Sequence, residues 1–417
     1  MIFQFPIRST ASLLVCVTLL VGACSRPGSM ADSSALKVID QTALQTMVAN
    51  TAKELLVPGA LVLLRTPQGE FTATYGTTQL GTASPPGPRT HFRIASNTKT
   101  MTAAVIMQLA QEGKVSVDDP VSKYVTGVPN GDNITIAQLL EMRSGLFSYT
   151  DDPIMSATMD TDPAKVWTTA EVLAIAFAHP PNFPPGARYE YSNTNYALLG
   201  VVAEKVDGRP LSQQMHDRLF DPLVMQDTEL PASNVNSIPE PFSHGYLYGS
   251  SSVALTGEPP YSPEVQAAAR AGTLLPRDYT GVNHSFAAAA GGVISTANDL
   301  ATWIKALVTG RVLNAAYQRS WLDSLQPEDP SKPEGQKYGY GIAQLSWGPN
   351  TIYFHGGETP GYNSKISYDL ANDVTLIIWT NLTISLDGQQ TANTLWVKVL
   401  DHIYKVSPLA PSPSSTK

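Results

Sequence analysis

Cysteine is almost absent from this sequence. Its 417 residues include two cysteines, Cys16 and Cys24, and the long body that follows them has none. A disulfide framework and a cysteine-ligated zinc site are therefore excluded from that body. The seven histidines show no paired ligand spacing, and no cofactor motif is present. We expect neither a metal nor a cofactor.

Basic runs and further long apolar runs are missing as well. Lysine and arginine total 27 against 35 aspartate and glutamate residues, a formal net charge of −8 at pH 7. Because nucleic-acid binding depends on clustered positive charge, we expect no nucleic-acid partner. After the N-terminal region there is no long apolar run that could cross a membrane, so we expect the rest of the chain to lie outside the membrane. The 43% of hydrophobic residues are enough for a large core.

The N-terminus is typical of an export signal. One early cation, Arg8, precedes an apolar run over 11–23 that is too short for a membrane span. The run ends in Gly-Ala-Cys24, which resembles a bacterial lipoprotein processing site. We expect a signal peptide over 1–23, lipidation of Cys24, and a polar tether over 24–37 that anchors an exported protein to the bacterial envelope. Ordinary secretory cleavage, which gives a secreted soluble protein, is the alternative.

The predicted secondary structure changes twice along the rest of the chain. Residues 59–78 predict a strand hairpin around a Pro-Gln-Gly turn, and a helix over 101–110 that is apolar nearly all round predicts burial. The next segment predicts helices between loops rich in proline and glycine, at 135–143, 168–178, 194–206 and 211–219. A helix, four strand-like runs and a closing helix follow, at 296–310, 338–347, 351–357, 364–370, 374–382 and 393–405.

We infer from this order a single catalytic unit over 38–405. Its α/β part is split between about 38–115 and 286–405, and the two ends are expected to share one sheet. Residues 116–285 form a mostly helical insertion between them. The tail over 406–417 is disordered by composition.

Ser96 and Lys99 stand three residues apart at the start of the buried helix. This spacing places the hydroxyl and the amine on one helix face. Burial lowers the pKa of a lysine amine, so that the amine can act as a base toward the hydroxyl. A capping serine with a lysine that reaches solvent is the alternative. A second pair with the same spacing, Ser34 and Lys37, has no buried helix after it. The Ser-x-x-Lys spacing alone therefore does not distinguish a catalytic pair from a structural one.

Two further stretches offer polar groups. Tyr191 and Asn193 stand at a turn before an apolar helix, where the phenol could relay a proton and the amide could hold Lys99 and a substrate carbonyl. A helix N-cap is the alternative for this stretch. His355 follows a strand and precedes two glycines, which would let a substrate approach the strand edge closely; a plain turn with a surface histidine is the alternative. The backbone N–H of Glu358 is a candidate oxyanion donor.

Three motifs in this order make the sequence over roughly 40–405 resemble the serine penicillin-recognising enzymes. They are Ser96-x-x-Lys99, Tyr191-x-Asn193 and His355-x-Gly357. That family comprises class C β-lactamases, D-alanyl-D-alanine carboxypeptidases and related esterases. Because of the histidine in the third motif, the sequence looks most like the secreted D-alanyl-D-alanine carboxypeptidases.

The resemblance implies a β-lactamase/transpeptidase-like fold of the α/β (α+β) class, in which helices flank an antiparallel sheet and a mostly helical subdomain is inserted. It also implies that Ser96 is acylated, that Lys99 and Tyr191 transfer protons, that Asn193 binds substrate and that His355 gives electrostatic and relay support. The backbone N–H groups of Ser96 and Glu358 would form the oxyanion hole. The cleft would be lined by Phe147, Thr150, Phe286, Gly356 and Gly357.

Two departures from the carboxypeptidase pattern concern recognition of the substrate carboxylate; others are Phe286, where relatives often have tryptophan, and Met142-Arg143, where many have a histidine. Gly356 stands where those relatives have threonine, and Ile342-Ala343-Gln344 offers no cation where they place an arginine for the substrate carboxylate. Lys365 and Arg277 are candidates to replace it. We therefore expect a serine acyl-enzyme hydrolase of the D-alanyl-D-alanine carboxypeptidase type, acting on small peptides, amides or esters and acylated by β-lactams. An esterase, a class C-like β-lactamase and a non-enzymatic penicillin-binding sensor are the alternatives.

The predicted anchor can be tested by metabolic labelling with a radioactive or alkyne-bearing fatty acid. Full-length protein expressed in a bacterial host should incorporate the label, and Cys24→Ala should not, because the lipid is attached through the side chain of that cysteine. Cys16→Ala is the matched control and should label like the parent chain. Equal labelling of both variants would contradict lipidation at Cys24.

Overall fold

The computed structural model describes residues 35–256 and 261–406. The predicted signal peptide, Cys24, the tether as far as residue 34 and the tail from residue 407 lie outside these residues. Within the described part of the chain, no helix is both long and apolar enough to cross a bilayer.

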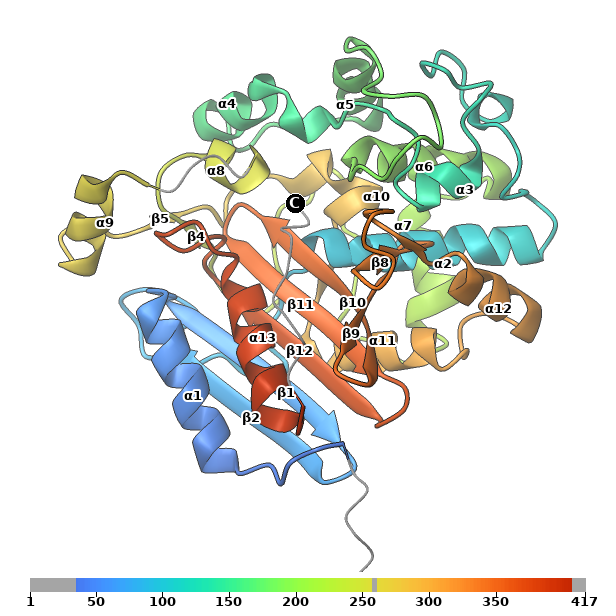
Figure 1. The fold of residues 1–417 in the computed structure, drawn as a ribbon. Helices are drawn as coiled ribbons and strands as arrows, with labels where there is room; N and C mark the ends of the chain where they lie inside the picture. The colour runs from blue at the N-terminus through green and yellow to red at the C-terminus, as the bar shows by residue number, and fades with distance from the viewer. Residues whose placement is uncertain (1–34, 257–260, 407–417) are drawn as a thin grey trace, which may run out of the picture. The chain divides into compact units, whose positions relative to one another are not determined.

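Eight strands form one antiparallel sheet in the order β2-β1-β12-β11-β10-β9-β8-β7 (Figure 1). The pairing of β1 with β12 confirms that the two ends of the chain share a sheet. In chain order the strands are β1 Gly59–Thr66, β2 Gly69–Gly76, β7 Gln326–Pro327, β8 Lys337–Tyr338, β9 Ala343–Trp347, β10 Asn350–Thr359, β11 Tyr362–Asp369 and β12 Val374–Thr380. Two short strand pairs stand apart from it, β3 Phe92–Arg93 with β6 Ile294–Ser295, and β4 Tyr246–Leu247 with β5 Arg277–Asp278.

Helices cover both faces of the sheet. Helices α1 (Gln41–Glu54) and α13 (Thr391–Ile403) pack on one face, and α11 (Ala297–Val308) packs on the other (Figure 1). Because neither face meets water, β11 and β12 are buried along their whole length, and β12 is mostly apolar. Helix α1 was not predicted, because its sequence has only a weak apolar stripe.

The middle of the chain forms the helical layer that the sequence predicts. Its helices are α3 Ile136–Leu140, α4 Pro153–Thr161, α5 Thr169–Phe177, α6 Asn193–Asp207, α7 Leu211–Met215 with a π-helical turn His216–Phe220, α8 Ser251–Thr256 and α9 Pro263–Arg270. Helix α3 is shorter than expected, since Met142 adopts a positive φ of 60° soon after it. Helices α10 (Ala288–Gly291) and α12 (Ala315–Asp323) follow this layer along the chain.

Helix α2 (Thr98–Gln111) packs against α6 and α10 and confirms the predicted buried helix (Figure 1). Every residue of α2 is buried except Gln108 and Gln111. Gly113, at a φ of 72°, follows its C-terminus, where a left-handed residue ends many helices. Ser96 precedes this helix in a 3₁₀ turn, Ala95–Asn97.

Residues 35–37, assigned to the tether by composition, belong instead to the folded unit. Leu36 is 3% exposed and forms an antiparallel bridge with Tyr404. The N–H of Lys37 donates to the carbonyl of Ile403 over 2.7 Å. A single apolar side chain in a polar stretch gives no periodicity, so the sequence pattern could not show that Leu36 enters the core.

This correction predicts a stability difference between two neighbouring residues. Leu36→Ala should lower the free energy of unfolding by about 2–3 kcal/mol, because it removes a buried leucine from the core. Val38→Ala is the matched control; Val38 is 88% exposed, so its loss should change that free energy by less than about 0.5 kcal/mol. Urea denaturation of chains beginning at residue 30 measures both, and equal effects would contradict the correction.

Candidate active site

The 3₁₀ turn Ala95–Asn97 carries Ser96 at the point where α2 meets the sheet. Ala95 has a positive φ of 48°, a strained conformation for a residue with a Cβ. The amide of Asn97 holds the turn, since its Nδ2 donates to the carbonyl of Ile94 over 3.0 Å and to Ser364 Oγ over 2.8 Å. The serine is therefore fixed to strand β11 as well as to its helix.

Lys99 lies fully buried behind the serine. Its Nζ donates to Ser96 Oγ over 2.9 Å, to Asn193 Oδ1 over 2.7 Å and to the carbonyl of Ala290 over 2.7 Å. Burial lowers the pKa of this amine well below its usual range. The alternative of a lysine that reaches solvent is thereby excluded, and the amine is suited to accept a proton from Ser96.

Asn193 is the first residue of α6, and its orientation is set by two hydroxyl acceptors, Ser148 and Thr150. Its N–H donates to Ser148 Oγ over 3.1 Å and its Nδ2 donates to Thr150 Oγ1 over 2.9 Å. Those contacts fix the amide so that its oxygen faces Lys99. The neighbouring Ser192 occupies the N-cap position without a capping side-chain hydrogen bond.

Tyr191 lies beside both reacting groups. Its ring centroid is 4.8 Å from Lys99 Nζ. Burial raises the pKa of the phenol strongly, and a hydrogen bond with Ser96 opposes this only in part. The phenol therefore stays protonated at neutral pH, as a group that donates a proton to a leaving atom must be.

His355 lies on β10 and is buried. Its Nδ1 lies 2.6 Å from the carbonyl of Gly356 and its Nε2 lies 3.0 Å from the hydroxyl of Tyr338. Burial and then the charge of Lys99 lower the pKa of the imidazole to about 3, so it is neutral at physiological pH. Nδ1 must donate to the carbonyl, and Nε2 accepts from the tyrosine.

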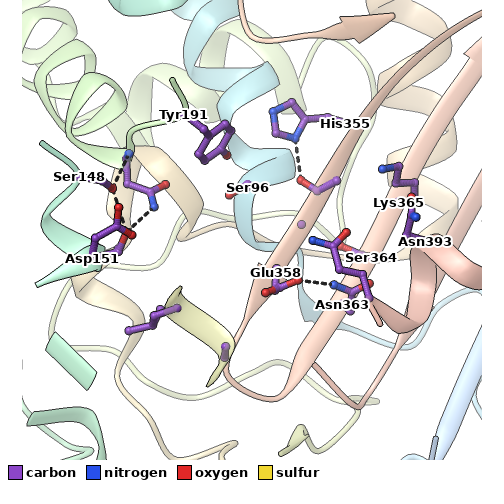
Figure 2. A pocket seen from close by; sticks show the side chains of 17 residues that line it. Ser96, Ser148, Asp151, Tyr191, His355, Glu358, Asn363, Ser364, Lys365 and Asn393 are labelled. Atoms are coloured by element: carbon purple, nitrogen blue, oxygen red, sulfur yellow. Dashed lines mark hydrogen bonds between the residues drawn. The ribbon is translucent and has the colours of Figure 1, made fainter. Parts of the chain in front are cut away.

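One cavity brings most of the predicted residues together (Figure 2). The predicted residues on its wall are Ser96, Thr150, Tyr191, Asn193, His355, Gly356, Gly357 and Glu358. Sequence reasoning did not assign Ser148, Asp151, Ala254, Leu255, Asn363, Ser364, Gln390 and Asn393 to this wall, and it named Lys365 only as a candidate. Strand alternation carried part of that information, since Lys365 pairs with Gly356 across β11 and β10.

Two expected cleft residues do not line this cavity, which corrects the prediction. The Phe147 ring stacks on His179 with centroids 3.9 Å apart. Phe286 is buried against His284, and its carbonyl accepts a hydrogen bond from Tyr149 over 2.8 Å. Spacing from a motif places a loop but does not determine which side of the loop each side chain takes.

The wall carries charge of both signs but no metal site. Asp151 and Glu358 are acidic and Lys365 is basic. Glu358 Oε2 accepts from Asn363 Nδ2 over 3.2 Å. Within the described ranges no group of three or more histidine, cysteine, aspartate or glutamate residues could hold a metal ion. Ser96 and Glu358 both lie on this wall. The oxyanion hole formed by their backbone N–H groups stays a prediction.

The sequence matches the family described as Beta-lactamase over residues 44–401. This chain belongs to the beta-lactamase family. Its fold is accordingly the β-lactamase/transpeptidase fold, and the large antiparallel sheet with flanking helices agrees with the expected class.

Relatives of this beta-lactamase family member include amidohydrolases. A D-stereospecific amidohydrolase from Streptomyces sp. superposes with a TM-score of 0.72 at 32% identity, covering 85% of this chain and 97% of that one. The D-amino acid amidase from Ochrobactrum anthropi SV3, complexed with L-phenylalanine amide, superposes with a TM-score of 0.72 at 25% identity, covering 87% and 97%. Protein flp of Staphylococcus aureus (strain MW2) is 32% identical over 203 residues, 47% of this chain and only 40% of that relative.

Replacement by alanine is expected to be disruptive at Gly357 and tolerated at Gly356. A Cβ at Gly357 would lie 2.1 Å from the carbonyl oxygen of Ile94, which is backbone and cannot yield without moving β10 away from the Ser96 turn. We expect Gly357→Ala to lower the free energy of unfolding by about 1–3 kcal/mol and to slow covalent labelling by a fluorescent penicillin by about 100-fold.

Gly356→Ala is the matched control. A Cβ there meets its nearest atom, Lys365 Nζ, at 3.6 Å, which is an ordinary contact. Its free energy of unfolding should stay within about 1 kcal/mol of the parent value. Equal destabilisation of the two variants in urea would contradict the close approach of β10 to the turn.

Proposed function

We propose that this protein is a serine acyl-enzyme hydrolase of the D-alanyl-D-alanine carboxypeptidase type, which cleaves amide bonds of small peptidoglycan-type peptides and is acylated by β-lactams. One observation carries the proposal. The fully buried Lys99 amine touches both the hydroxyl of Ser96 and the amide of Asn193. A nucleophile in contact with a base of lowered pKa is the arrangement that acyl transfer needs.

The proposed reaction proceeds in two halves. Ser96 Oγ forms a bond to the substrate carbonyl carbon while its proton passes to the Lys99 amine, and the N–H groups of Ser96 and Glu358 hold the oxyanion. The carbon–nitrogen bond then breaks as Tyr191 gives a proton to the leaving amine and regains one from Lys99. Water attacks the ester, loses its proton to the same pair, and releases the acid and the free serine.

A second candidate is an amidase for amides of amino acids with a free amino group. The carboxylates of Asp151 and Glu358 on the cavity wall favour it, because an ammonium group on the acyl part of the substrate would need such partners. The two amidohydrolases described above support this candidate. We also propose export and lipid anchoring at Cys24, which only the N-terminal sequence supports.

The proposal predicts that Ser96 is the only covalent site. Purified protein from residue 30 should be labelled by a fluorescent penicillin and should hydrolyse diacetyl-L-Lys-D-Ala-D-Ala, an amino acid amide or a p-nitrophenyl ester. Ser96→Ala should abolish labelling and lower turnover by at least about 1,000-fold, because the nucleophile is gone. Ser148→Ala, which removes another hydroxyl from the cavity wall and one acceptor of Asn193, should be labelled more slowly but to completion, because the nucleophile is still present.

Three outcomes would each contradict part of the proposal. Labelling that persists in Ser96→Ala would place the nucleophile elsewhere. Labelling of the parent protein without turnover of any substrate would favour a penicillin-binding sensor. Turnover of esters alone would favour an esterase.

A further inference from the structure

The sulfur of Met142 accepts hydrogen bonds from two buried donors at the start of α6. The backbone N–H of Ser192 donates to it over 3.5 Å, and Asn195 Nδ2 donates to it over 3.4 Å. Both separations are ordinary for sulfur, which is a larger atom than oxygen. Met142 and Asn195 are fully buried, and Ser192 is 2% exposed. The thioether therefore acts as a polar group inside the core.

No oxygen atom shares this role with the sulfur. Within the described ranges, neither the N–H of Ser192 nor Asn195 Nδ2 has a second acceptor. The other end of the Asn195 amide is occupied, since its Oδ1 accepts from Ser144 Oγ over 2.5 Å. A thioether is a weak acceptor, but a buried N–H group with no acceptor at all is destabilising. Without the sulfur, both donors would be buried and unsatisfied.

The backbone of Met142 is bonded to the same segment. Its carbonyl accepts from the N–H of Glu190 over 2.9 Å, so this one residue holds the chain on both sides of Tyr191. The φ of Met142 is 60°, a value that residues with a side chain rarely adopt and that persists only where the surroundings hold it. A strained residue whose carbonyl and sulfur both serve one segment indicates that the position of that segment matters.

The loop that carries Met142 packs tightly against the stretch that precedes Tyr191. The carbonyl of Gly145 accepts from the N–H of Asn182 over 2.8 Å. A Cβ at Gly145 would lie 2.1 Å from the carbonyl oxygen of Phe183. The loop therefore has no room to move toward that stretch, and the sulfur is held in place relative to α6.

The segment that Met142 holds carries two groups that contact the buried amine. The centroid of the Tyr191 ring lies 4.8 Å from Lys99 Nζ, and Asn193 Oδ1 accepts a hydrogen bond from the same Nζ over 2.7 Å. Tyr191 and Ser96 both line the cavity (Figure 2). Because proton transfer requires hydrogen-bond distances, a small shift of this backbone would slow acylation.

We propose that Met142 is a positioning residue whose thioether, acting as a hydrogen-bond acceptor, fixes the backbone of Tyr191 beside Ser96. The inference rests on the proposed acyl transfer at Ser96 and adds to it a residue that does not line the cavity. A packing role would need only the shape and volume of the side chain. An acceptor role needs a lone pair where the sulfur stands, so the two roles predict opposite rankings of the same substitutions.

Met142→Leu and Met142→His separate the two roles. Leucine keeps the apolar volume but has no acceptor, whereas histidine places Nδ1 at the same number of bonds from Cβ as the sulfur and tolerates a positive φ. The rate of covalent labelling of the full chain by a fluorescent penicillin should fall about 10-fold in Met142→Leu, because Tyr191 is held less firmly. Met142→His should label within about 3-fold of the parent rate.

Met107→Leu is the matched control. Met107 lies on α2 and is fully buried, and in the part of the chain that the structure describes no donor bonds to its sulfur. Its labelling rate should stay within about 2-fold of the parent rate, because leucine and methionine exchange readily in a core. A parent-like rate in Met142→Leu together with a slower one in Met142→His would show a packing role and overturn the inference.

Hydrogen exchange separates this inference from the proposed function, because it needs no turnover. It is measured by NMR on chains labelled with ¹⁵N-serine, and Ser192→Ala identifies the signal. In the parent chain the N–H of Ser192 should exchange at least about 100-fold more slowly than in an unfolded peptide. Met142→Leu should lose about 10-fold of that protection, and Met142→His should keep it.

The exchange result stands even if the parent protein is not acylated by any penicillin. Free exchange of this N–H in the parent chain overturns the inference without any variant, so a Met142→Leu chain that fails to fold does not remove the test. Full protection in a folded Met142→Leu chain overturns it as well. Lost protection with an unchanged labelling rate would show that the bond exists but does not position Tyr191.

Discussion

The burial of the Lys99 amine is the constraint on which the rest of the site depends. An amine with no access to water must either be paired or lose its proton, and here three acceptors surround it. Those acceptors come from the Ser96 turn, from the start of α6 and from α10, so three separate segments are positioned by one nitrogen. Thr150 accepts a hydrogen bond from the side-chain amide of Asn193 and orients its oxygen toward Lys99, while Ser148 accepts one from the backbone N–H of the same residue.

The sheet and the helical layer contribute unequal parts. The helical segments bring Ser96, Lys99, Tyr191 and Asn193, to which the proposed function assigns nucleophilic attack, proton transfer and binding of the substrate carbonyl. Strand β10 brings His355 and Gly357. Residue 357 must be glycine, since a Cβ there would have no room against the carbonyl oxygen of Ile94. Because the imidazole is neutral and hydrogen-bonded to its own strand and to Tyr338, it shapes the polar wall without adding a positive charge.

Much of this architecture could be predicted from the sequence, and the remainder could not for identifiable reasons. The buried helix after Ser96, the strand hairpin and the sheet shared by both ends follow from apolar patterns, and the structure confirms them. The direction in which the Phe147 and Phe286 side chains point depends on loop conformation, and loops have no periodic pattern of apolar residues from which it could be predicted. Lys365 sits in a strand whose alternation indicates its face, but only the position of α13 shows that this face opens onto the cavity. The burial of Leu36 could not be predicted, because a single buried residue produces no periodic pattern in the sequence.

The place of β12 in the sheet has a consequence for biosynthesis. This strand lies between β1 and β11, so residues about 300 positions apart, such as Ala60 and Thr380, must meet before the sheet is continuous. Pairings of such high contact order form late, because a long loop must close first. A nascent chain that has not yet released its last strand from the ribosome therefore lacks the support that holds β10 and β11 against the serine turn. Ser96 is therefore synthesised early, and the pocket around it is complete only at the end of synthesis.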